Sequence, residues 1–403
     1  MNNTFCSLAW LGITTDPDGS IKPCAVSTDK ITKDDGSDFN LGIDSLQDIY
    51  NSKAYVSIRE KMLKGETVTG CDVCYNNEKY GRESRRLINN AIFKDEDYSK
   101  TVVDLNIKHF DLRLSNKCNL KCRMCSPMNS SLIEEEYLEN KDTLDSFYFK
   151  SNSQLADWAD TQTFDDNFNS QINNVHTLYM TGGEPTVIKK NYDILQRLID
   201  SGRSKDITVM INTNLVSYNP KFYNLMKQFG NVIVQISIDA IDGLATYIRY
   251  PSDFKTIDKN LRELLALEGN ISIKATCAIQ ILNLNKLDKL FDYFESFNRS
   301  AGRQVIDIRP IFVQHPQRSD FIYLPTAYKI ACFRKVFIWM MNDCKYQSPQ
   351  FKDSINALKK KCYETVNPEN HLIDFIKFNN ELDRIRNVSL RDYNTELYQV
   401  LNA

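Results

Sequence analysis

Short apolar runs alternate with amphipathic stretches through the middle of the chain. Each run has the length of a buried strand and is rich in β-branched residues. The six runs lie at 107–114, 175–182, 206–214, 231–239, 271–279 and 304–313. Helical spacing of apolar residues marks the stretches 187–201, 219–229, 255–267 and 285–299. The alternation predicts an α/β fold in which a parallel sheet of six βα units curls into a partial (β/α)6 TIM-like barrel.

The two ends of the chain lack this alternation. A hairpin strand and two helices are expected near the amino end, at 19–26, 45–65 and 81–92. The last part is expected to be helical and to cap the barrel or cover its mouth. The polar, acidic stretch 140–172 is expected to be an insertion. We therefore expect a small α+β module at 1–90, the barrel core at 91–325 and a helical extension at 326–403.

Composition narrows the class of protein. Hydrophobic residues make up 42% of the 403 residues and charged residues 25%, as in an ordinary globular protein. A formal net charge of −2 argues against a dominant role in binding nucleic acid. No apolar run approaches the roughly 18 residues of a membrane span. The amino terminus also lacks the pattern of a signal peptide. We therefore expect a cytoplasmic protein that does not bind a membrane.

Eleven cysteines stand out in a chain expected to be in a reducing compartment. There, clustered cysteines bind metals or do redox chemistry more often than they form disulfides. The first seven fall into two groups with metal-like spacing. The other four are expected to be buried core thiols, although a third metal cluster is the alternative: Cys277, Cys332, Cys344 and Cys362.

Three cysteines, Cys118, Cys122 and Cys125, follow the first expected barrel strand. Thiolates at this spacing can wrap one face of an iron–sulfur cluster, which normally takes four. One iron would then stay open for a substrate or cofactor. The alternatives are zinc or three buried structural cysteines. Closed zinc sites usually add a second CxxC pair or histidines, and no histidine follows nearby.

Polar groups gather where the next strands end. Glycines let a backbone approach a ligand closely, carboxylates accept hydrogen bonds from an ammonium group, and an arginine fork suits a carboxylate. Taken singly, each residue also fits a turn or cap. The candidates are Gly182, Gly183, Glu184 and Pro185 after the second strand, Asn212 and Asn214 after the third, Ser237 and Asp239 after the fourth, and Arg249 further on.

The stretch "CNLKCRMC" resembles the CxxxCxΦC signature of the radical S-adenosylmethionine (SAM) superfamily, with Met124 in the apolar position. The resemblance implies a partial (β/α)6 barrel and a [4Fe–4S] cluster on Cys118, Cys122 and Cys125, whose open iron binds SAM. The reduced cluster then cleaves SAM to a 5′-deoxyadenosyl radical that abstracts a substrate hydrogen. An electron donor such as flavodoxin or ferredoxin is implied.

The resemblance also assigns roles to the other candidates. It makes the Gly182–Pro185 turn the GGE motif that holds the amino group of SAM. It places Ser237 and Asp239 near the ribose, and Asn212 and Asn214 near SAM or substrate. Arg249 resembles the arginine that pairs with the SAM carboxylate.

A second set, Cys6, Cys24, Cys71 and Cys74, fits a structural zinc site or a closed cluster equally well on spacing alone. The sequence around these cysteines, including "DGSIKPCAVS", resembles the SPASM/twitch module of many radical SAM enzymes. That module binds auxiliary [4Fe–4S] clusters, and its four-cysteine form binds one. The module usually follows the barrel, whereas here it precedes the barrel. The resemblance therefore does not indicate how the module packs against the barrel.

The expected function is hydrogen-atom abstraction from a peptide or small-molecule substrate, with the auxiliary cluster assisting an oxidation. One alternative is an enzyme that modifies tRNA or nucleotides, for which Arg82, Arg85 and Arg86 form the notable basic patch. The opposing interpretation of that patch is a solvated surface helix. Another alternative is a non-catalytic iron–sulfur or zinc scaffold, which would need no SAM pocket.

Overall fold

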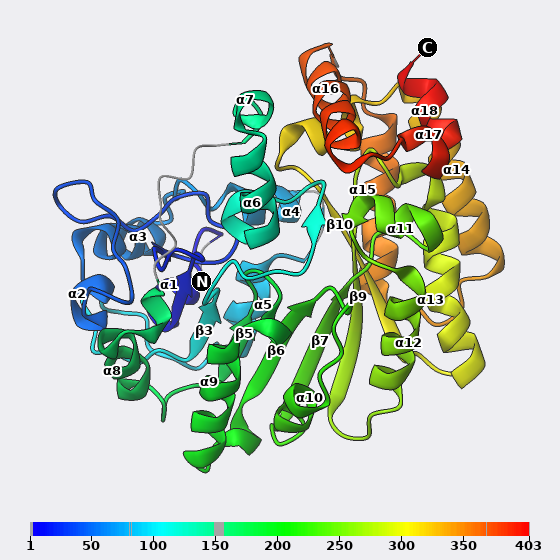
Figure 1. Cartoon of the computed structure of the whole chain (residues 1–403). Coiled ribbons are helices and arrows are strands. Elements are labelled where there is room, and N and C mark those ends of the chain that lie inside the picture. Colours follow the sequence, from blue (N-terminus) through cyan, green and yellow to red (C-terminus); the bar gives the residue numbers. More distant parts are fainter. Residues whose placement is uncertain (1–2, 80, 82, 149–156, 368, 403) are drawn as a thin grey trace.

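The structure is a computed structural model and describes residues 3–79, 81, 83–148, 157–367 and 369–402 (Figure 1). Its centre is an eight-stranded sheet in the order β10-β9-β7-β6-β5-β3-β1-β2. Six of these strands coincide with the predicted runs: β3 (His109–Leu112), β5 (Thr177–Met180), β6 (Thr208–Thr213), β7 (Asn231–Ser237), β9 (Ile271–Ile279) and β10 (Ile306–Phe312). Each pairs in parallel with its neighbours among the six, which confirms the partial barrel.

Burial alternates along the barrel strands. In β6, Val209, Ile211 and Thr213 are buried, whereas Met210 and Asn212 on the other face are only half-buried. The apolar face packs under helices, so the half-buried residues face the barrel interior. The covering helices follow the predicted stretches: α9 (Lys189–Asp200), α10 (Pro220–Met226), α12 (Phe254–Leu265) and α13 (Leu287–Ala301). Two shorter elements, α11 (Asp242–Ile248) and β8 (Arg249–Tyr250), join β7 to α12.

The amino-terminal hairpin extends the barrel sheet beyond its first strand. Strand β1 (Gly12–Thr15) pairs in parallel with β3, and β2 (Ile21–Lys22) pairs antiparallel with β1. The predicted single helix over 45–65 is wrong, because the segment forms α2 (Leu46–Tyr50) and α3 (Lys53–Lys64). The hydroxyl of Ser52 accepts a hydrogen bond from the Tyr55 N–H and starts a new helix.

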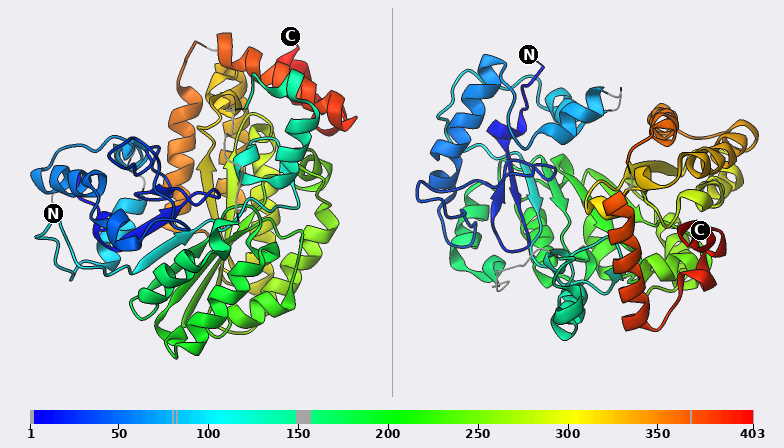
Figure 2. Two further views of the ribbon diagram at one scale, coloured as in Figure 1. Left: turned by 60° about the vertical axis from the view of Figure 1, so that its left-hand side comes forward. Right: turned by 90° about the horizontal axis from the view of Figure 1, so that it is seen from above.

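Two more helices of the amino-terminal part, α4 (Asp72–Lys79) and α5 (Arg85–Ile92), lie against different parts of the barrel, α4 near its far edge strand β10 and α5 near β3. Helix α5 starts four residues after the predicted bound of 81 because Ser84 caps it. Asn76 and Asn77 of α4 line a cavity of about 240 Å³ together with Phe312 of β10 and Ala357. Because the hairpin adjoins β3 and α4 faces β10, this part lies across the gap that the partial barrel leaves open (Figure 2).

The predicted insertion 140–172 lies between α6 (Ser131–Glu139) and β5, and contains α7 (Lys141–Leu144) and α8 (Gln162–Ser170). Its section 149–156 falls outside the described residues. The end of the insertion is not simply polar, since Trp158 is buried and donates through Nε1 to the Pro17 carbonyl. It therefore packs against the amino-terminal part.

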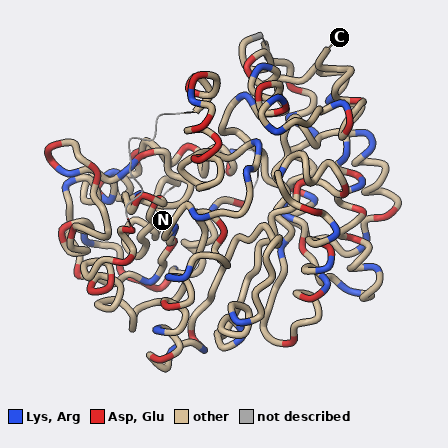
Figure 3. Tube along the Cα trace, viewed as in Figure 1, with Lys and Arg blue, Asp and Glu red and all other residues tan. Residues whose placement is uncertain are grey.

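The carboxyl-terminal region is helical, as predicted. Its helices are α14 (Thr326–Asn342), α15 (Pro349–Tyr363), α16 (Glu369–Arg386), α17 (Leu390–Tyr393) and α18 (Thr395–Leu401). Helix α16 lies at the same end of the molecule as α6 and α7, above the carboxyl ends of the strands (Figure 1). Charges of both signs are interspersed over the outer helices (Figure 3). In the described part of the chain, no helix combines the length and apolar character needed to cross a membrane.

Candidate active site

The loop after β3, here called the cysteine loop (residues 115–126), carries the three predicted ligands. Within it, β4 (Lys121–Cys122) pairs antiparallel with β8, which sets Cys122 opposite Arg249. A guanidinium nitrogen of Arg249, Nη1, lies 3.7 Å from the Cys122 Sγ. The Cys125 N–H donates to the Cys122 carbonyl at 3.0 Å and closes a turn. The loop is thus fastened to β8 at the carboxyl ends of the strands.

Burial raises the pKa of the Cys118 and Cys125 thiols to about 12, and the neighbouring Cys122 adds to both shifts. The charge of Arg249 opposes the corresponding rise at Cys122. Among the described residues, no three His, Cys, Asp or Glu side chains lie close enough together to hold one metal ion. Grouped, largely buried sulfur donors suit the chemistry of an iron–sulfur cluster, which is larger than a single ion.

The GGE turn packs directly on the cysteine loop. The Gly183 N–H donates to the Ser115 carbonyl at 3.1 Å, and the Glu184 N–H donates to the Lys117 carbonyl at 2.8 Å. A Cβ at Gly183 would lie 2.0 Å from the Lys117 carbonyl oxygen. Glycine is therefore required here for contact between two backbone segments. Pro185 is buried and begins a short 3-10 turn.

Glu184 joins the ends of two barrel strands. Its buried carboxylate accepts hydrogen bonds from the Thr186 and Thr213 hydroxyls at 2.7 and 2.8 Å, and from the Asn214 N–H at 2.8 Å. Burial raises the pKa of Glu184, and these donors oppose the rise. Oε2 accepts only the Asn214 bond among the described residues, so it has room for another donor such as an ammonium group.

Asp239 and Arg249 bond to each other. The Arg249 Nε donates to the buried Asp239 carboxylate at 2.7 Å, and the Ala278 N–H donates to its other oxygen at 2.7 Å. Asp239 thereby fixes an arginine that also faces Cys122. Ser237 is the last residue of β7, two residues before Asp239, and it is half-buried.

Asn214 links the third strand end to the cysteine loop, because its Nδ2 donates to the Asn119 Oδ1 at 2.7 Å. Asn212 instead points along the sheet and accepts from the Tyr179 hydroxyl at 3.0 Å. Met124 is partly buried against the main core. The GGE turn, Asn214 and Arg249 therefore contact the cysteine loop, whereas Asn212 lies lower on the inner face and no contact joins Ser237 to the loop among the described residues.

Sequence reasoning missed Arg123, which lies between two predicted ligands and is 2% exposed. Its guanidinium donates to the Tyr247 carbonyl at 2.9 Å, to the Asn379 Oδ1 at 2.8 Å and to the Asp383 carboxylate at 2.5 Å. The last two partners belong to α16, so this helix holds the cysteine loop from above. The position of an arginine between two predicted ligand cysteines was a sequence signal, but nothing in the sequence pointed to its partners 256 and 260 positions away.

The structure also gathers the second cysteine set around the start of α4. Burial, followed by the neighbouring thiols Cys24, Cys74 and Cys71, raises the pKa of Cys6. Burial raises the pKa of Cys71 to about 12, with Cys24 and Cys74 adding to the shift. One buried and three half-buried thiols within electrostatic reach of one another suit an iron–sulfur cluster in donor chemistry, whereas among the described residues they are not close enough together to hold a single metal ion.

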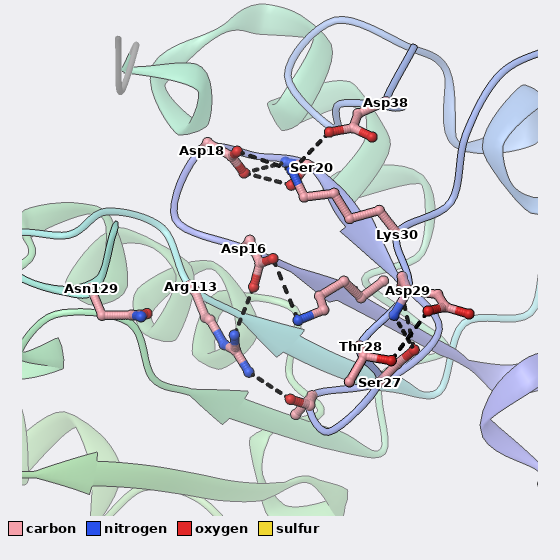
Figure 4. A network of polar contacts seen from close by, with 12 residues as sticks. Asp16, Asp18, Ser20, Ser27, Thr28, Asp29, Lys30, Asp38, Arg113 and Asn129 are labelled. Atoms are coloured by element: carbon pink, nitrogen blue, oxygen red, sulfur yellow. Dashed lines mark hydrogen bonds and ion pairs between the residues drawn. The ribbon is translucent and has the colours of Figure 1, made fainter. Parts of the chain in front are cut away.

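Arginines tie this set to the barrel. Arg113 follows β3 and donates to the Asp16 carboxylate at 2.7 Å and to the carbonyl of Ala25, next to Cys24, at 3.0 Å (Figure 4). Arg85 donates to Asp111 of β3 at 2.9 Å. Both cysteine groups are therefore connected through the strand that leads into the cysteine loop.

The predicted basic patch does not form a surface in the described residues. Arg85 pairs with Asp111, and Arg86 pairs with Glu78 and donates to the Phe5 carbonyl. Arg82 lies outside the described residues. Both described arginines are internal, which matches neither a nucleic-acid surface nor a solvated helix.

The four remaining cysteines lie in or against the apolar core, as expected. Three are buried and one is partly buried: Cys277, Cys332 and Cys362, and Cys344, respectively.

Known proteins resemble parts of this chain. It is 23% identical over 292 residues to the radical SAM cyclopropyl synthase TigE of Paramaledivibacter caminithermalis, covering 69% of this chain and 57% of TigE. It is 25% identical over 196 residues to an uncharacterised protein of Methanocaldococcus jannaschii, and this match covers 47% of this chain and 59% of that protein. The matches thus span less than two thirds of the length of these curated relatives.

Solved structures align more loosely. The structure of anSMEcpe with bound AdoMet is 14% identical, covers 60% of this chain and 63% of its own, and gives a TM-score of 0.40. The structure of Streptococcus suis SuiB bound to precursor peptide SuiA is 12% identical. Its alignment covers 71% of this chain and 64% of SuiB and gives a TM-score of 0.36. Alignments at these scores carry no conclusion about this chain.

The sequence model of the radical SAM superfamily matches residues 112–292. This part of the chain is therefore similar to a radical SAM domain, and the cysteine loop, the GGE turn and the Asp239–Arg249 pair all fall inside the matched region.

Proposed function

We propose that the chain is a radical SAM enzyme that removes a hydrogen atom from a peptide or small-molecule substrate. In this proposal Cys118, Cys122 and Cys125 hold a [4Fe–4S] cluster with one iron open to SAM. The observation that carries it is the packing of the loop with the three thiols, through its Ser115 and Lys117 carbonyls, against the GGE turn inside the matched region. A scaffold would not need this arrangement at the ends of barrel strands.

When bound, the cluster and SAM would supply a radical able to abstract hydrogen. The chain's own residues would bind, orient and shield these groups. Asp239 holds Arg249 so that its positive charge stabilises a thiolate at Cys122 and leaves other donors for a carboxylate. Glu184 locks two strand ends together and offers Oε2 to an ammonium group. Helix α16 covers part of the loop by holding Arg123.

We infer that the second cysteine set holds an auxiliary [4Fe–4S] cluster. Four protein thiols complete the usual ligand number, which favours a role in electron transfer over direct substrate binding. An electron acceptor near the barrel suits an oxidation, because a substrate radical must lose an electron to become a closed-shell product. The likeness to a cyclopropyl synthase supports a reaction at carbon. An external donor such as flavodoxin or ferredoxin would supply the reducing electron.

The test is oxygen-free reconstitution with iron and sulfide, followed by metal analysis and electron paramagnetic resonance. The native chain is expected to bind about eight irons and a Cys118→Ala/Cys122→Ala/Cys125→Ala variant about four. Formation of 5′-deoxyadenosine after reduction should vanish in that variant. A Cys344→Ala variant is the matched control, since Cys344 lies outside both groups, and it should keep both properties.

Retention of SAM cleavage in the triple variant would refute the catalytic assignment. A native protein that takes up zinc alone would refute both cluster assignments. Loss of about four irons on Cys71→Ala/Cys74→Ala, with SAM cleavage kept, is the result expected for the auxiliary site.

A further inference from the structure

The last two barrel strands present charged groups to the interior. Lys274 of β9 is in register with Asp307 of β10, and Thr276 is in register with Arg309. Partners in parallel strands share a face, so these four side chains lie on one side of the sheet. Gln235 of β7 is in register with Lys274 and continues the row toward Asn212. This is the half-buried inner face, because the alternate residues of β9 pack under helices.

The arginines that face this interior are already paired. The distances from guanidinium nitrogen to carboxylate oxygen are 2.9 Å for Arg85–Asp111, 2.7 Å for Arg113–Asp16 and 2.6 Å for Arg309–Asp307. Lys274 takes part in no ion pair within the described ranges. Asp307, already paired with Arg309, and the exposed Glu83 act on Lys274 only as more distant charges.

A half-buried ammonium group without a counterion is unfavourable, since it has lost hydration without gaining a partner. Burial and the nearby charge of Arg309 lower the pKa of Lys274, which shows how close the two cations are. An anion between them would offset their repulsion and give the half-buried ammonium group a partner. Lys274 is thus the one inner-face cation of the described residues that still lacks a counterion.

Further donors surround the same point. Arg309 engages Asp307 through Nε, and its two terminal nitrogens form no hydrogen bond with the rest of the described chain. The Thr276 hydroxyl oxygen is buried and likewise has no partner among described residues. A cavity of about 690 Å³ reaches Lys274 and Asp307 from the start of these strands. Lys274 therefore borders open space together with Asp307, and Arg309 and the Thr276 hydroxyl follow on the same face, so the point carries two positive charges, one carboxylate and a hydroxyl.

The position along β9 connects this point to the candidate active site. Ala278, whose N–H holds Asp239, lies two residues beyond Thr276 and four beyond Lys274. At about 3.3 Å per residue, Lys274 is about 13 Å below that level. A ligand anchored at Lys274 would extend several carbon atoms toward the cysteine loop.

We propose that Lys274, with Arg309 and Thr276, binds a carboxylate of the substrate and thereby selects acidic peptides or small carboxylic acids. Its place as a substrate site rests on the proposed function, whereas carboxylate binding itself does not depend on radical chemistry. Two strong donors in fixed positions suit a carboxylate, since each of its oxygens can accept separately.

The test compares acidic probes with neutral isosteres on the full, reconstituted chain by calorimetric titration at low ionic strength. The peptide arm uses acetyl-Gly-Glu-Gly-amide against acetyl-Gly-Gln-Gly-amide, and the small-molecule arm uses glutarate against glutaramide. The acidic probe should bind about tenfold more tightly, between the values for surface and buried charge pairs. Lys274→Met should abolish that preference, and Lys274→Arg should restore part of it.

Lys259→Met is the matched control, because the Lys259 side chain is 75% exposed on α12. It should leave the preference unchanged, and melting temperatures should show that each variant is folded. Equal or undetectable binding of acidic and neutral probes, or a preference that survives Lys274→Met, overturns the proposal. The preference should also persist in the triple cysteine variant, so failure of this site and failure of the radical chemistry are separate results.

Discussion

Removal of the Arg386 charge should destabilise the protein far more than removal of a neighbouring charge on the same helix. Arg386 of α16 bonds to Glu136 of α6 through two contacts, of 3.0 and 2.7 Å. Their side chains are 1% and 3% exposed. This pair joins residues 250 positions apart and fastens α16 over the helix that follows the cysteine loop.

The magnitude follows from what Arg386→Met leaves behind. Glu136 would stay buried, and of the described residues only Lys121, 3.5 Å away, would remain as a charged partner. Removing one member of a buried, hydrogen-bonded pair costs about 3–5 kcal/mol, because the remaining charge has lost its compensation. The partial compensation by Lys121 favours the lower end of that range. Arg384→Met removes an ion pair with Glu381 in which the arginine side chain is 62% exposed. This substitution should lower the free energy of unfolding by less than about 1 kcal/mol.

Urea unfolding measures both variants, and hydrogen–deuterium exchange of the cysteine loop reports the local effect. Arg386→Met should speed exchange over residues 118–125, since α16 also anchors Arg123. Adding Glu136→Gln to Arg386→Met should recover part of the lost stability, because no unpaired charge then remains buried. If Arg386→Met loses no more stability than Arg384→Met, the proposed role of α16 is wrong.

Two further predictions concern local packing and pH. Gly183→Ala should lower the free energy of unfolding by at least about 3 kcal/mol, because its Cβ would overlap the Lys117 carbonyl. It should also speed hydrogen–deuterium exchange of the cysteine loop. Gly36→Ala, at a left-handed residue in open space, should cost only about 1 kcal/mol, and equal losses would refute the packing argument. Burial lowers the pKa of His109 to about 3, so the unfolded chain binds a proton below about pH 6.5 that the folded chain excludes. Stability is therefore lost as pH falls, by about 1.4 kcal/mol between pH 7.5 and 5.5, and urea unfolding of His109→Leu should lack that share.

Local sequence pattern was sufficient for the barrel strands. The β-branched runs and the helical spacing between them are properties of short segments, so all six strands appear where they were expected. The prediction of a single helix over 45–65 was wrong because of a local hydrogen bond that apolar spacing does not reveal. The apolar spacing continues through Asn51 and Ser52, but the Ser52 hydroxyl caps a new helix there. The spacing of apolar residues shows that α2 and α3 bury the same side of the segment, but it does not show where one helix ends and the next begins.

The sequence by itself determined which groups could do chemistry, because three cysteines in one loop and a glycine–glycine–glutamate turn are spaced by the covalent chain. Only the tertiary structure decided their partners. It paired Arg249 with Asp239 and Arg123 with Asp383 of α16, and among the described residues it left Lys274 without an ion pair. Such pairings depend on which distant segments pack together, and residues up to 260 positions apart share no spacing from which contact could be predicted.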